Sequence, residues 1–126
     1  MQCYDPLMPP DPEAWQALDE DERIELVLEY HREAGEELPE KEQNFLHATA
    51  HVIVENQLAL GTSPVPDTLG RVMREGLERH DAIHAIAAVL MGEMYEGLRD
   101  STADIGEKYR QRLRGLTARR WRKGEW

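Results

Sequence analysis

The sequence contains few of the residues that reinforce small folds. There is one cysteine, Cys3, among 126 residues, and aromatic residues make up only 6% of the chain. A lone cysteine excludes an internal disulfide and any multi-cysteine zinc site. No apolar run approaches the roughly 18 residues of a membrane span, and residues 1–10 lack the basic start and apolar block of a secretory signal. We therefore expect a cytoplasmic protein that makes no contact with membranes.

The remaining composition is typical of one folded domain. Hydrophobic residues make up 40% of the chain and charged residues 32%, which is too apolar for a fully disordered protein. The length is that of a single domain. Apolar residues recur at spacings of three and four, and no run alternates as a half-buried strand would. The sequence therefore predicts an all-α fold, a small helical bundle of four to five helices.

Proline and charge distinguish the two ends of the chain from its middle. The prolines within residues 1–12 predict an extended N-terminal arm. We expect residues 13–116 to form the helical bundle and residues 117–126 to form a basic C-terminal tail that contains Trp121 and Trp126. Residues 1–99 carry 21 acidic and 7 basic residues, whereas residues 100–126 carry 4 acidic and 8 basic residues. An acidic surface repels nucleic acid, so we expect nucleic acid to bind weakly at most, through the tail. A protein partner or a homodimer remains open.

Local signals divide the middle of the chain into helices. A capping box at Asp19 and Glu22 predicts a helix over about 20–34, and glycines at 35 and 61 mark helix ends. Further helices are expected over about 40–60, after Asp67, over about 80–98, and after a polar break at 99–102. The segment 40–60 is apolar almost all round, which indicates a helix in the centre of the protein.

The histidines form two pairs at helical spacing. His47 and His51 are four residues apart, as are His80 and His84, and Glu55 follows His51 by another four. Residues at this spacing share one face of a helix. Two facing helices could offer His51 and Glu55 from one side and His80 and His84 from the other, with His47 as a further candidate. Imidazole and carboxylate ligands suit zinc, iron, nickel or manganese, so the sequence predicts a site for a divalent transition metal.

A hydrogen-bonded histidine core without metal explains the same pattern. Buried imidazoles need partners, and other side chains could supply them. The protein would then be a non-enzymatic interaction module, and the sequence does not decide whether it is an enzyme. His31 stands alone on an apolar stripe, so we expect it to be structural. Asn56, Gln57 and Asp81 are candidates to hold an imidazole in one tautomer.

Two motifs carry family resemblances. The pattern H-x3-E-x-Q from His51, a Gly/Pro loop, R-H-x3-H from Arg79 and then Glu93 resembles a bacterial domain-of-unknown-function family of small helical proteins. The likeness covers about residues 45–98, implies a compact helical fold and brings no assigned activity.

The order H-x3-E then H-x3-H is also similar to the middle helices of hemerythrin-like bundles. That resemblance implies iron ligands at His51, Glu55, His80 and His84. No histidine follows His84, so the His-x4-Asp pair of the last hemerythrin helix has no counterpart in this chain. Three-histidine bundles of the DinB group are similar in ligand count.

Overall fold

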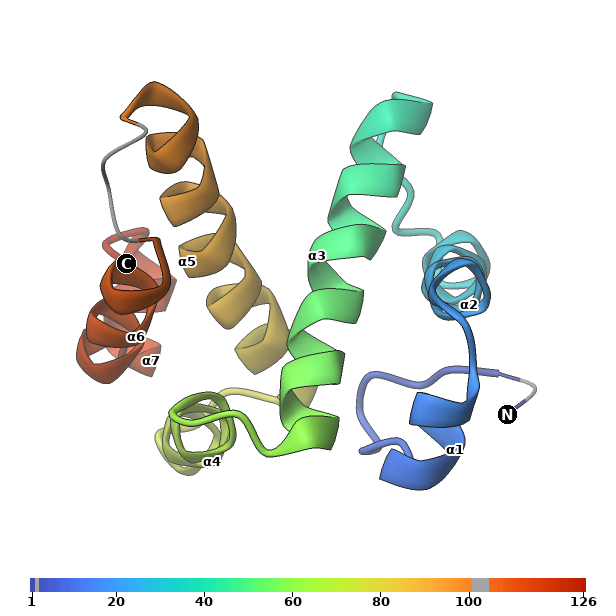
Figure 1. The fold of residues 1–126 in the computed structure, drawn as a ribbon, viewed down its shortest axis with the longest axis horizontal. Helices are drawn as coiled ribbons and strands as arrows, with labels where there is room; N and C mark the ends of the chain where they lie inside the picture. Colours follow the sequence, from blue (N-terminus) through green and yellow to red (C-terminus); the bar gives the residue numbers. More distant parts are fainter. Residues whose placement is uncertain (2, 101–104) are drawn as a thin grey trace.

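The protein is all-α, as the sequence predicts. The computed structural model describes residues 1, 3–100 and 105–126, and within these ranges it has helices and no strand (Figure 1). The helices are α1 (Pro12–Ala17), α2 (Glu20–Glu33), α3 (Lys41–Leu60), α4 (Val65–Arg74), α5 (Arg79–Arg99), α6 (Ile105–Gly115) and α7 (Ala118–Lys123). These seven exceed the expected four to five, because two short helices, α1 and α7, accompany the longer ones. The expected break at 99–102 falls mostly outside the described residues.

The ends of α2 and α3 follow the local signals in the sequence. The Asp19 carboxylate accepts a hydrogen bond from the backbone N–H of Glu22 at 2.8 Å, and the Glu22 carboxylate accepts one from the N–H of Asp19 at 3.2 Å. Gly61 ends α3 with a φ of +67°, a left-handed conformation that suits glycine. These ends fix the positions along α2 and α3 from which the histidines project.

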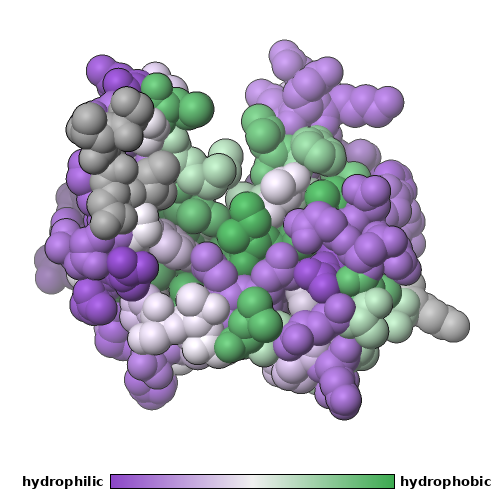
Figure 2. Space-filling view, viewed as in Figure 1, coloured by the Kyte–Doolittle hydropathy of each residue, from purple (hydrophilic) through white to green (hydrophobic). Residues whose placement is uncertain are grey.

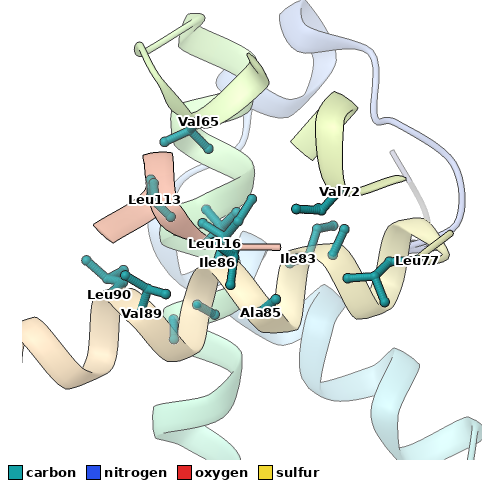
Figure 3. Close-up of a cluster of buried hydrophobic side chains, with 14 of the residues drawn as sticks. Val65, Val72, Leu77, Ile83, Ala85, Ile86, Val89, Leu90, Leu113 and Leu116 are labelled. Atoms are coloured by element: carbon teal, nitrogen blue, oxygen red, sulfur yellow. The ribbon is translucent and has the colours of Figure 1, made fainter. Parts of the chain in front are cut away.

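Helix α3 separates two clusters of buried side chains. On one side it packs against α4 and α5, and the core there includes Val65, Val72, Ile83, Ile86, Leu113 and Leu116 (Figure 3). On the other side it packs against α1 and α2, over a smaller cluster that includes Tyr4, Trp15, Ile24, Val27 and Val52. Figure 1 shows α3 standing between these two groups of helices.

Both ends of the chain fold onto the helices. Tyr4, in the proline-containing arm, is buried, and the carbonyl of Pro6 accepts a hydrogen bond from Arg79 at 3.0 Å. At the other end α7 brings Trp121 against the larger core cluster. The arm therefore supplies groups to the interior of the protein. None of the described helices has the length and apolar character needed to cross a membrane.

Candidate metal centre

All five histidines of the chain lie together, although they come from three helices. His31 projects from α2, His47 and His51 from α3, and His80 and His84 from the first turns of α5. The ring centroids are 4.7 Å apart for His31 and His47, 4.8 Å for His47 and His84, and 5.4 Å for His51 and His80. The fold thus assembles an imidazole cluster from segments up to 53 residues apart.

Four of these residues present nitrogen atoms at metal-ligand spacing. One ligand atom from each of His31, His47, His51 and His84 lies within 4.8 Å of those of the other three. The Nε2 atoms of His31 and His47 are 3.2 Å apart. Two nitrogens bonded at about 2.0 Å to one tetrahedral zinc ion are separated by about 3.3 Å. This pair therefore needs little movement to share an ion.

Several imidazole nitrogens in the cluster have no hydrogen-bond partner among the described residues. They are His51 Nδ1, His80 Nε2 and His84 Nε2, and each of these atoms is buried. A buried polar atom without a partner costs about 1–3 kcal/mol. A metal ion would supply the missing partner for more than one of them.

The tautomer of His31 follows from its backbone contact. Its Nδ1 lies 2.8 Å from the carbonyl oxygen of Val27, one turn earlier in α2. A carbonyl only accepts, so Nδ1 carries the proton and donates. The lone pair of Nε2 is then directed into the cluster, toward His47.

A chain of hydrogen bonds sets the tautomer of His51. Arg79 donates to both oxygens of Glu55, at 2.8 and 2.9 Å, and the Tyr4 hydroxyl donates to Oε2 of the same carboxylate. The phenol has one proton, so the 2.7 Å contact between Tyr4 and His51 Nε2 is a hydrogen bond donated by the imidazole. His51 Nδ1 is left unprotonated, and it is the atom without a partner. In metal sites a ligand histidine usually donates a hydrogen bond from its other ring nitrogen in this way.

Glu55 does not take the place that the sequence predicts for it. Its carboxylate is buried in an ion pair with Arg79 and also accepts from Tyr4. Within the described residues it belongs to neither group of potential ligands. The strongest available partner of a buried carboxylate is a guanidinium, and Arg79 reaches it because α3 and α5 cross there. The hemerythrin-like resemblance implies this carboxylate as an iron ligand, and in this structure it is paired with Arg79.

His31 takes part in the cluster, contrary to the structural role expected from its isolated position in the sequence. It contributes to the four-histidine group and also to a second group with Glu36 and His80. His80, a predicted ligand, belongs only to this second group, and Glu36 is exposed.

The residues expected to fix the imidazole tautomers do not contact the histidines through the hydrogen bonds found in the described residues. Asn56 accepts from the Trp15 indole at 2.9 Å, and Gln57 accepts from the Tyr109 hydroxyl at 2.7 Å. Asp81 is exposed. Tyr4 and Val27 take the expected role instead.

Burial lowers the pKa of four of the five histidines. The pKa of His84 falls from 6.5 to about 3, first because the ring is desolvated and then because His80, His47 and His31 surround it. Burial and the neighbouring imidazoles also hold the pKa of His51 well below 6.5. The pKa values of His47 and His80 are lowered mainly by burial, although Glu36 acts in the opposite direction. At neutral pH these rings are neutral, the form that binds metals.

We predict that the metal-free protein loses stability as the pH falls from 7 to 5. Unfolded histidines take up protons near pH 6.5, whereas folded His51 and His84 remain neutral, so acid favours the unfolded state. Each such residue lowers the free energy of unfolding by about 1 kcal/mol per pH unit on average in this range, approaching about 1.4 kcal/mol per unit below pH 6. Thermal denaturation in the presence of a chelator should show the melting temperature falling with pH. His84→Gln should make this dependence shallower, and an unchanged slope would contradict the argument.

Comparisons with known proteins yield no relative for this chain. No protein family, no curated protein and no solved structure matches it. The family resemblances of the motifs therefore stay predictions.

Proposed function

We propose that the protein binds one divalent transition-metal ion through His31, His47, His51 and His84. The observation that carries this proposal is the state of His51. Its ring is 1% exposed, its Nε2 donates to Tyr4, and its Nδ1 is buried without a partner. One nitrogen of this ring lies within 4.8 Å of a nitrogen of each of the other three histidines. In a polar core without metal the unprotonated Nδ1 would stay buried without a hydrogen-bond partner, which is rare in folded proteins.

The ligand set favours zinc among the metals considered. Imidazole nitrogens suit zinc, copper, iron and nickel, whereas carboxylate and carbonyl oxygens suit magnesium, calcium and manganese. With Glu55 bound to Arg79, the four proposed ligands are all nitrogen atoms. Four such ligands around one centre satisfy the tetrahedral preference of zinc. Zinc is therefore the first ion to test, and nickel and iron are the natural competitors.

A histidine core held by hydrogen bonds alone is the alternative function. In that case the protein would be an interaction module that acts on a protein partner or as a homodimer. The contacts of His31 with Val27 and His47, and of His51 with Tyr4, are of the kind such a core requires. The unpartnered nitrogens of His51, His80 and His84 weigh against it.

The test is a calorimetric titration of the full chain with zinc chloride. The protein is purified without a histidine tag, because the tag would add imidazoles outside the cluster, whereas all five histidines of the chain lie within it. We expect one zinc per chain and no binding in His51→Ala. Tyr4→Phe should retain the ligands but weaken affinity about 10- to 100-fold, because it removes the group that fixes the His51 tautomer.

His80→Ala is the matched control within the cluster. It removes an imidazole that lies outside the four-histidine group, so zinc should still bind. Loss of binding in His80→Ala but not in His47→Ala would identify the other group as the site. Absence of zinc binding in the unmodified protein would reject the proposal and favour the alternative.

A further inference from the structure

An apolar cleft opens directly onto three of the proposed ligands. It lies between α3 and α5, has a volume of about 440 Å³, and is lined in part by His47, His51 and His84. The rest of its wall is largely hydrophobic: Leu46, Ala50, Ala87, Ala88, Met91 and Trp121. Figure 2 shows the molecule hollowed between the upper parts of α3 and α5, with hydrophobic residues along the hollow. The volume is within the range of small-molecule sites.

Two tyrosine rings that do not line the cleft pack against three of the histidines. Tyr30 packs edge-on against His31 and His80, with centroids 5.3 and 5.5 Å away, and Tyr4 packs edge-on against His51 at 5.3 Å. The buried His31, on α2, is not part of the cleft lining, whereas the partly exposed His47 and His84 line it. Four imidazoles complete the tetrahedral set of zinc, but zinc sites sometimes expand to five ligands, and a fifth ligand would reach the ion from the cleft.

The charge at this position would be positive. The proposed ligands are neutral imidazoles, and the charge of Glu55 is already balanced by Arg79. The described lining of the cleft contains no charged side chain, and Gln43 is its polar residue besides the histidines. The exposed Glu36 lies beside His31 and His80, outside the cleft lining. A divalent ion would therefore present positive charge to an apolar cleft, where an anionic ligand is attracted strongly.

We propose that this cleft binds a small organic anion, a carboxylate with an apolar chain or ring. The carboxylate oxygen would add to the ion as a fifth ligand from the cleft, and the apolar part would lie against Leu46, Ala88 and Met91. This inference deepens the proposed function and rests on it, because the carboxylate has no cationic partner in the described lining without the metal. Metal binding alone does not require the cleft to be hydrophobic.

The test compares three probes on zinc-loaded and zinc-free protein by calorimetry. Hexanoate has both the anionic donor and the apolar chain, acetate has the donor alone, and 1-hexanol has the chain alone. We expect hexanoate to bind zinc-loaded protein at least about tenfold more tightly than either other probe, and to bind zinc-free protein at least about tenfold more weakly. Equal binding of hexanoate with and without zinc would overturn the proposal, as would equal binding of hexanoate and hexanol.

Two methionines on α5 provide a matched pair of variants. Met91 lines the cleft and Met94 does not, and they are 38% and 43% exposed, so a charge is tolerated at both. Met91→Glu should reduce hexanoate affinity at least about tenfold through repulsion, whereas Met94→Glu should leave it unchanged. Both should bind zinc as the unmodified protein does. Loss of hexanoate binding in both variants or in neither would overturn the cleft as its site.

The two proposals fail in distinguishable ways. If zinc binds and hexanoate shows no preference, the ligand proposal is wrong and the metal site stands. If zinc does not bind, both are wrong.

Discussion

Replacing Glu55 with alanine should destabilise the protein by about 3–5 kcal/mol, the usual cost of leaving one member of a buried ion pair without its partner. Glu55 is 2% exposed and Arg79 is 5% exposed. The guanidinium would retain its bond to the Pro6 carbonyl but lose both bonds to the carboxylate. The Tyr4 hydroxyl would lose its acceptor as well. We expect the melting temperature to fall by more than about 10 °C in thermal denaturation.

A second ion pair in the same protein provides the control. Glu93 is buried and accepts from Arg112 at 2.9 Å, but the Arg112 side chain is 38% exposed. Water can solvate Arg112 when its partner is removed, so Glu93→Ala should cost less than Glu55→Ala. The double variant Glu55→Leu/Arg79→Met, which removes both charges, should recover much of the loss. A smaller effect at Glu55 than at Glu93 would contradict the structural role assigned to this pair.

Glu55 also shows what helical spacing can and cannot predict about a site. The spacing of His47, His51 and Glu55 correctly places them on one side of a helix, because four residues are slightly more than one turn. It cannot tell whether the carboxylate binds a metal or a guanidinium. That depends on where α5 crosses α3, and the crossing brings Arg79, the residue before His80, against Glu55. Local sequence carries no information on that crossing.

The sequence does not predict His31 as a metal ligand, for a related reason. A single histidine on an otherwise apolar stripe has no pattern of its own, so the sequence offers no reason to separate it from the core of α2. Its function depends on α2 packing beside α3, which brings its ring to 4.7 Å from that of His47. The burial of Tyr4 is equally impossible to predict from the local sequence. The prolines predict an extended arm, but not that the arm folds back against Trp15 and His51.

The fold itself was easier to predict because much of its evidence is local. The capping box at Asp19 and the left-handed glycine at 61 can be identified without knowledge of the tertiary structure. Helix α7 had similar signals, since the Thr117 hydroxyl accepts from the N–H of Arg120 and Gly124 ends the helix. The run of basic residues between them favoured the interpretation as a tail. The helix forms because Trp121 packs against the larger core cluster.

Zinc should raise the melting temperature of the protein by about 10 °C or more at saturating concentration, and a chelator should reverse the shift. A ligand that binds the folded state alone stabilises it by about 2.7 kcal/mol at 100 times its dissociation constant and by about 4.1 kcal/mol at 1,000 times. The four nitrogens come from three helices, α2, α3 and α5, so unfolding would separate them. Magnesium should produce no comparable shift, because it prefers oxygen ligands.

His31→Ala gives the sharpest version of this experiment, since the sequence alone assigns that residue no role in metal binding. If the cluster is the site, the variant should lose the zinc-induced shift, and His80→Ala should keep most of it. Zinc bound loosely by the many surface carboxylates would instead raise or lower the melting temperature equally in both variants. The same shift in His31→Ala and the unmodified protein would therefore place the ion outside the cluster. If His31→Ala loses the zinc-induced shift in melting temperature and His80→Ala keeps it, the ligands must come from α2 as well as from α3 and α5. Only the folded protein brings these three helices together.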